Sequence, residues 1–167
     1  MTMSNQNTNE ALLLEYLTFR LGEETYGLDI MAVKEIRGYE KGTKLANVPE
    51  FVLGVVNLRG DIVPIVDLRI RFNVGKPIYD EFTIVIMLNI NERFVGIVVD
   101  EVCDVIKVDS ETIKPAPQFG AVFDMEYLEG LVTVEDIMVI LVNIQALVTS
   151  DTFALIDKNN EEQERPQ

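Results

Sequence analysis

Residues 54–69 read GVVNLRGDIVPIVDLR, and their apolar pattern returns 76 positions later (130 − 54) in residues 130–144, GLVTVEDIMVILVNI. Each segment opens with glycine and carries, near its end, a residue that accepts hydrogen bonds at a helix start, Asp67 in one and Asn143 in the other. Apolar runs of this length around a tight turn predict a β-hairpin followed by a short helix. The repeat therefore predicts two similar β-rich halves, an arrangement that favours binding over catalysis.

A second pair of segments recurs in the same order. Residues 26–36 match residues 95–105 in their glycine, valine and isoleucine positions, at a spacing of 69 (96 − 27). Two blocks that recur in one order, with a loop adjusting the distance between them, indicate a duplicated architecture. The alternative is chance similarity between Val/Ile-rich strands, because apolar patterns are degenerate.

The composition limits the class of protein. A chain of 167 residues can bury a core as one domain or two small subdomains. Because no segment reaches 18 consecutive apolar residues, we expect no transmembrane helix. Residues 1–10 lack the basic start and apolar stretch of a signal peptide, so we expect a cytosolic location. Cys103, the single cysteine, lies in the strand-like run 98–106, which predicts a buried, inert thiol.

Several functional classes lack the residues they need. The chain has no histidine, which removes the commonest general base and metal ligand. It has no P-loop, Rossmann glycine fingerprint, nucleophile elbow or EF-hand spacing. The net charge of −14 repels phosphate backbones and makes nucleic acid an improbable partner. We therefore expect no catalytic residue, cofactor or metal.

The periodicity predicts short strands, glycine turns and few helices. Asp29 is expected to cap a short helix in which Ile30, Val33 and Ile36 form an apolar stripe ending near Gly38. Strands are predicted at 15–21, 25–28, 52–58, 61–66, 82–88, 93–99, 102–108, 131–134 and 137–142, with helices after Asp67 and Asn143. The predicted organisation is a disordered arm 1–13, a domain 14–157 with approximate subdomains 14–77 and 78–150 and a helix 151–157, and a disordered tail 158–167.

Four motifs carry a resemblance to a known family: residues 26–30 (YGLDI), 57–60 (NLRG), 63–69 (VPIVDLR) and 95–100 (VGIVVD). Together they resemble the CheW family of bacterial chemotaxis coupling proteins, from about residue 15 to residue 157. The resemblance implies a mainly β fold: two intertwined, five-stranded SH3-like barrels with a hydrophobic seam, short helices and a C-terminal helix.

The same resemblance implies a non-enzymatic adaptor. Its partners would be the cytoplasmic tips of methyl-accepting chemoreceptors and the regulatory domain of the histidine kinase CheA, with no nucleic acid and no direct membrane insertion. The location would be cytoplasmic, at receptor arrays reached through protein contacts. Two alternatives stay open: a scaffold of this fold serving pilus motility or second-messenger control, and a small β-barrel ligand binder or enzyme using carboxylates such as Asp61, Asp67 or Asp100.

The family positions tied to coupling are occupied by Glu35 and Arg59, whose opposite charges predict a pair across the first barrel. The alternative is an exposed ion pair that contributes roughly 0–1 kcal/mol to stability and nothing to function. Val33, Ile36 and Arg37 border the same predicted protein-interaction surface, although apolar residues there are more often core than contact.

Two glycines and one mismatch complete the prediction. Gly60 allows a positive φ in the turn, and Gly54 allows close approach of a second segment, either a partner or a part of the fold. In the second repeat, residues 133–136 (TVED) stand where residues 57–60 (NLRG) stand in the first. The turn that differs is where we expect a partner to bind.

Overall fold

The computed structural model describes residues 12–116 and 127–148. The predicted helix 151–157, the tail 158–167 and most of the arm 1–13 lie outside these residues. The strands are β1 (Leu13–Leu21), β2 (Glu24–Asp29), β3 (Val33–Gly38), β4 (Val52–Leu58), β5 (Asp61–Asp67), β6 (Ile84–Ile90), β7 (Arg93–Val99), β8 (Glu101–Asp109), β9 (Leu128–Val134) and β10 (Ile137–Val142). The helical segments are η1 (Ile30–Ala32), α2 (Leu68–Arg71), η2 (Ser110–Thr112) and α3 (Ile144–Val148).

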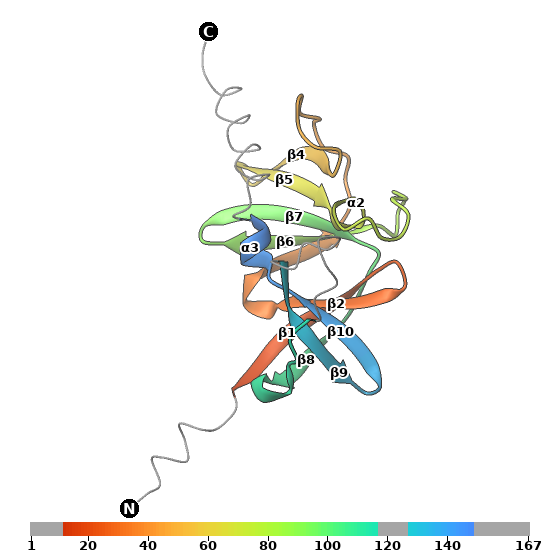
Figure 1. Ribbon diagram of the computed structural model, residues 1–167. Helices are drawn as coiled ribbons and strands as arrows, with labels where there is room; N and C mark the ends of the chain where they lie inside the picture. Colours follow the sequence, from red (N-terminus) through yellow and green to blue (C-terminus); the bar gives the residue numbers. More distant parts are fainter. Residues whose placement is uncertain (1–11, 117–126, 149–167) are drawn as a thin grey trace, which may run out of the picture.

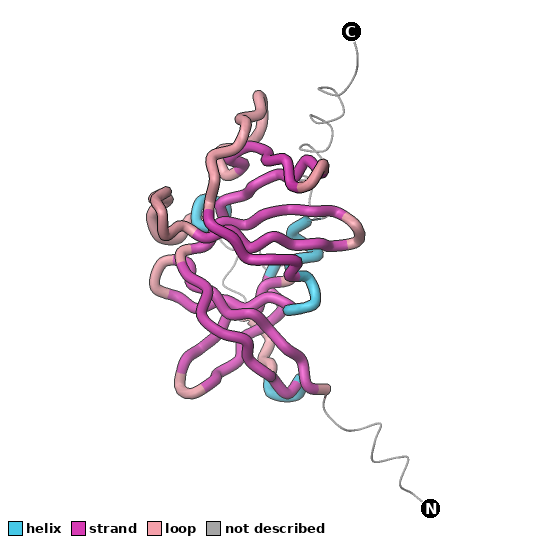
Figure 2. Tube along the Cα trace, turned by 180° about the vertical axis from the view of Figure 1, so that it is seen from behind, coloured by secondary structure: helices cyan, strands magenta, loops and turns pink. Residues whose placement is uncertain are grey.

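The described strands form two five-stranded sheets stacked on one another (Figure 1). The sheet β3-β6-β7-β5-β4 is called the first barrel, and the sheet β8-β1-β2-β10-β9 the second barrel. The order is the same in both, since each sheet places a hairpin (β6–β7 or β1–β2) in its middle. Figure 2 shows the same two sheets from behind, with strands making up most of the trace.

The two barrels are intertwined, as predicted. The second barrel combines the β1–β2 hairpin with β8, β9 and β10, and the first barrel combines the β6–β7 hairpin with β3, β4 and β5. Each barrel therefore contains strands from both sides of residue 77. The predicted boundary near residue 77 separates the first copy of each sequence repeat from the second copy. Both sheets contain strands from each side of it.

The repeated glycines lie where two strands run parallel. In the first barrel β5 pairs with β7 and sets Ile65 opposite Gly96, and in the second β10 pairs with β2 and sets Leu141 opposite Gly27. A Cβ on Gly96 would lie 2.6 Å from the Ile65 Cδ1, and one on Gly27 would lie 3.1 Å from the Leu141 Cδ2. Glycine leaves room at both positions for a large side chain that crosses from the neighbouring strand.

The duplication extends to the irregularities of the strands. β3 bulges at Lys34 and β8 at Cys103, which are 69 positions apart, and β4 bulges at Leu53 and β9 at Glu129, which are 76 apart. The predicted burial of Cys103 is wrong, because this cysteine is the bulge residue of an edge strand and is exposed. Chance similarity does not account for four bulges at the two repeat spacings.

Three buried clusters explain the apolar runs. One cluster fills the interior of the first barrel around Ile65 and Met87, and another fills the second barrel around Val139 and Leu141. The largest cluster takes side chains from both sheets and forms the hydrophobic seam between them. Because one face of a strand points into its barrel and the other into the seam, both faces are buried and the sequence does not alternate.

One predicted helix is wrong. Only Ile30–Ala32 forms a single 3₁₀ turn, which Asp29 caps by accepting a hydrogen bond from the Met31 amide at 2.9 Å. The following residues form strand β3 paired with β6, and Ile36 is exposed there. The predicted caps at Asp67 and Asn143 are confirmed, since their side chains accept from the amides of Arg69 and Ala146.

Candidate protein-interaction site

The predicted pair of Glu35 and Arg59 joins the two edges of the first barrel. Glu35 lies on β3, and Arg59 lies in the turn between β4 and β5; β3 and β4 are the outer strands of the sheet. The Arg59 Nη2 donates to the Glu35 Oε2 at 3.2 Å. The Glu35 side chain is 28% exposed and that of Arg59 is 70% exposed. The carboxylate thus anchors one end of a guanidinium that remains open to solvent.

The turn that carries Arg59 has a defined backbone conformation. Arg59 and Gly60 have φ values of 52° and 94°, so the turn is of the primed type that matches the twist of a hairpin. The Asn57 Oδ1 accepts from the Gly60 amide at 2.9 Å and holds the turn from its own strand. On the other side, the Arg37 Nη1 donates to the Glu35 Oε1 at 3.4 Å. Glu35 therefore lies between two arginines.

Exposed apolar side chains flank the ion pair. Ile36 follows Glu35 on β3 and is 45% exposed, and Ile62, three residues after Arg59, is 47% exposed. Val33 is half-buried and packs against the seam. Sequence reasoning missed Ile62, although it lies opposite the polar Asn57 in the hairpin, on a face where water would be expected.

Gly54 is explained by a segment of its own chain. The backbone of Thr43 exchanges two hydrogen bonds of 2.8 Å with Val55, which brings the Thr43 carbonyl against the Gly54 Cα. A Cβ at Gly54 would clash with this carbonyl oxygen, and the φ of 144° is unfavourable for other residues. Gly54 therefore permits the first barrel to form around the loop that precedes β4.

The second barrel repeats the apolar residues but not the ion pair. Val105 and Met138 occupy the positions of Ile36 and Ile62, at spacings of 69 and 76, and are 43% and 55% exposed. Asp104 and Glu135 occupy the positions of Glu35 and Arg59. Two acids cannot form an ion pair, and Asp104 instead accepts from the Val105 amide at 2.8 Å.

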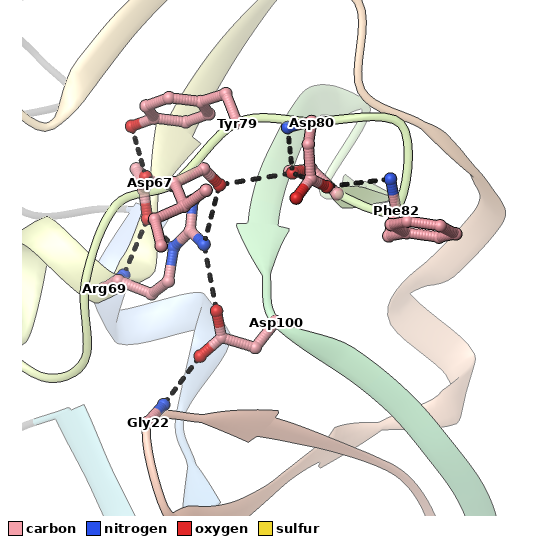
Figure 3. Close-up of polar contacts among 9 residues, drawn as sticks. Gly22, Asp67, Arg69, Tyr79, Asp80, Phe82 and Asp100 are labelled. Carbon is pink, nitrogen blue, oxygen red and sulfur yellow. Dashed lines mark hydrogen bonds and ion pairs between the residues drawn. The ribbon is translucent and has the colours of Figure 1, made fainter.

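A buried ionic network lies where the barrels meet (Figure 3). Arg69 is 3% exposed and donates from Nε and Nη2 to Asp67 at 3.1 and 3.0 Å, and from Nη1 to Asp100 at 2.9 Å. Tyr79 donates its hydroxyl to Asp67, and burial together with this bond raises the pKa of Tyr79. Burial would lower the pKa of Arg69, but its hydrogen bonds to the two carboxylates raise it above the ordinary value.

This network bears on the ligand-binder alternative. Both Asp67 and Asp100 are engaged by Arg69, while Asp61 is exposed at the start of β5. Among the residues that the structure describes, no three acidic or cysteine side chains are grouped to hold a metal ion. In the same residues no helix is long and apolar enough to cross a membrane.

Comparison with known proteins identifies the family. Residues 15–152 match the family model of the CheW-like domain. Chemotaxis protein CheW of Klebsiella aerogenes is 52% identical over 143 residues, or 86% of either chain, and that of Rhizobium meliloti is 34% identical over 82% of this chain and 88% of its own. The crystal structure of the scaffolding protein TtCheW from Thermoanaerobacter tengcongensis has a TM-score of 0.74 at 33% identity, covering 86% of this chain and 93% of that one. The family suggested by the sequence motifs is confirmed, and this chain belongs to the CheW family.

Proposed function

We propose that this chain is a non-enzymatic adaptor of bacterial chemotaxis that couples methyl-accepting chemoreceptors to the histidine kinase CheA. Family membership over residues 15–152 supports the pathway. The observation that carries the coupling role is the pair of equivalent exposed apolar sites, Ile36 with Ile62 on one barrel and Val105 with Met138 on the other. An adaptor needs two docking surfaces on one chain, and these two sites are candidates because the repeat places them on separate barrels.

The first barrel carries the more specific of the two surfaces. Arginine is enriched among residues that dominate binding energies, and Arg59 is presented to solvent by Glu35. Arg37, Val33 and Ile36 border it and belong to the same proposed interaction surface. Gly54 acts indirectly, because the close packing it permits sets the position of the hairpin that carries Arg59.

The proposed partners are the cytoplasmic tip of a chemoreceptor and the regulatory domain of CheA. A receptor tip is a helical hairpin in the family picture, and an apolar strip beside an arginine suits the apolar and acidic faces of such a helix. The proposal places the chain in the cytoplasm, at receptor arrays, through protein contacts alone.

A pulldown with purified kinase and receptor fragments tests this function. The wild-type chain should retain both fragments, and a strain deleted for it should lose directed swimming. Arg59→Glu, which reverses the charge without entering the core, is the matched variant and should weaken retention. If the wild-type chain retains neither fragment, the coupling role is wrong.

A further inference from the structure

The Arg69 network connects the two barrels through three links. Arg69 follows β5 of the first barrel and binds Asp100, the residue between β7 of the first barrel and β8 of the second. The other oxygen of Asp100 accepts from the Gly22 amide at 2.7 Å, in the β1–β2 turn of the second barrel. The Asp100 amide also donates to the Arg20 carbonyl at 3.0 Å. Figure 3 shows this path from Asp67 through Arg69 and Asp100 to Gly22.

Backbone contact reinforces the same junction. Gly22 and Gly75 both have positive φ values, 63° and 68°, and a Cβ on Gly75 would lie 3.1 Å from the Gly22 backbone. The turn of the second barrel thus touches the segment that leaves α2. The ion pair of Arg69 with Asp100 and the backbone contact of Gly22 with Gly75 therefore lie together, where the chain crosses from the first barrel to the second.

The equivalent junction on the other side carries different side chains. At spacings of 76 and 69, Asn143, Gln145 and Met31 occupy the repeat positions that correspond to Asp67, Arg69 and Asp100. Met31, Asn143 and Gln145 there line an open cleft between the barrels, together with Asn91, which replaces Gly22. Since Met31, Asn143 and Gln145 are uncharged, they cannot repeat the ion pairs of Arg69 with Asp67 and Asp100.

We propose that the Arg69–Asp100 pair is a clamp that fixes the relative orientation of the two barrels. Arg69 is then a positioning residue for simultaneous binding of two partners, an inference that rests on the proposed adaptor function. A buried ion pair is weak as a source of stability but restricts the arrangement of the groups it joins. A rigid adaptor loses less conformational freedom when the second partner binds, so affinity in the ternary complex rises.

Spin labels on the two barrels test the clamp without any partner. The native Cys103 is exposed on β8 of the second barrel, and Asp61→Cys adds a site at the exposed start of β5 in the first. The wild-type background should give one narrow distance distribution. Asp100→Ala removes a carboxylate that is 31% exposed, and it should clearly broaden the distribution. Asp100→Asn keeps a neutral acceptor and should lie between. A distribution that stays narrow in Asp100→Ala overturns the clamp.

Partner titrations test the positioning role. For Asp100→Ala, binding to the kinase fragment alone and to the receptor fragment alone should stay within about twofold of wild type, while binding of the second fragment to the preformed pair should weaken on the order of fivefold. Val63→Ala, inside the first barrel, is the control for general destabilisation and should keep ternary binding. Gln145→Ala, at the equivalent position of the other junction, should also keep it.

Three results would overturn the positioning role: loss of binary binding in Asp100→Ala, unchanged ternary binding despite broadened distances, or equal loss in Val63→Ala. A wild-type chain that binds neither fragment overturns the proposed function and the positioning role together. The spin-label distances are measured without any partner, so they test the clamp even if the chain binds neither fragment.

Discussion

The two barrels share strand order, bulges and crossing glycines, yet they differ in the charged residues at their edges and at their junctions. At the edge, Glu35 and Arg59 form an ion pair where the second barrel has two acids. At the junction, Arg69 is buried between carboxylates where the other side has Gln145, which is exposed. The duplicated residues build the two barrels. The charged residues that differ form the exposed ion pair at the edge of the first barrel and the proposed clamp at the Arg69 junction.

The largest expected effect separates the two junctions. Arg69→Met leaves Asp67, which is fully buried, without its cation, and should lower the free energy of unfolding by about 3–5 kcal/mol. Gln145→Met changes an exposed residue and should alter it by less than about 0.5 kcal/mol. Urea titrations of both variants measure the difference, and equal effects would remove the distinction between the junctions.

The next effect concerns a feature that both barrels share. Gly54→Ala sets a Cβ against the Thr43 carbonyl at a φ of 144° and should cost about 2–3 kcal/mol. Gly130→Ala meets the Lys114 carbonyl at 2.7 Å without the unfavourable φ, so its cost should be smaller. Thermal unfolding ranks the two variants. If the Gly54→Ala protein is as stable as wild type, the loop at Thr43 can move away from the new Cβ without a measurable cost in stability.

The edge ion pair should affect binding more than stability. Arg59→Ala should weaken assembly with the kinase and receptor fragments by at least about 1 kcal/mol, roughly fivefold. Its melting temperature should hardly change, because an exposed pair contributes about 0–1 kcal/mol. Glu135→Ala, at the equivalent turn, is the control and should bind normally. An Arg59→Ala protein that unfolds would instead make this residue structural.

The smallest effect would come from restoring the symmetry. Glu135→Arg places a cation opposite Asp104, as Arg59 lies opposite Glu35. The new pair should stabilise the second barrel by about 0.2–0.5 kcal/mol, with less gain in high salt because exposed pairs are screened. Chemical denaturation at two salt concentrations resolves such a change. A loss of stability would mean that the second barrel does not bring these two positions together.

Much of the fold was predictable because it is encoded locally and twice. The hairpin of β4 and β5, its turn at Arg59-Gly60 and the cap at Asp67 follow from residue types within one short segment. Strand β3 was not predictable, because an apolar residue at every third position is typical of a helix. The strand forms because β6 pairs with it from about fifty residues away, and no local pattern contains that partner.

The candidate site also has a part that the sequence predicts and a part that it does not. The pairing of Glu35 with Arg59 was predicted from charge and family motif, and it is observed. The sequence indicates Asp67 and Asp100 as possible reactive carboxylates, but it contains no local signal that both bind Arg69. They meet only because the chain crosses from one barrel to the other at Asp100, and that crossing is a property of the topology.

Simultaneous binding of two partners tests the adaptor role most directly. The receptor fragment would be titrated into a preformed complex of this chain with the kinase regulatory domain, with complex mass followed by sedimentation. The two equivalent exposed sites on separate barrels predict a ternary species in which the kinase fragment stays bound. Release of the kinase fragment as the receptor fragment binds would contradict the account, because it would mean that the chain offers one shared surface and not two.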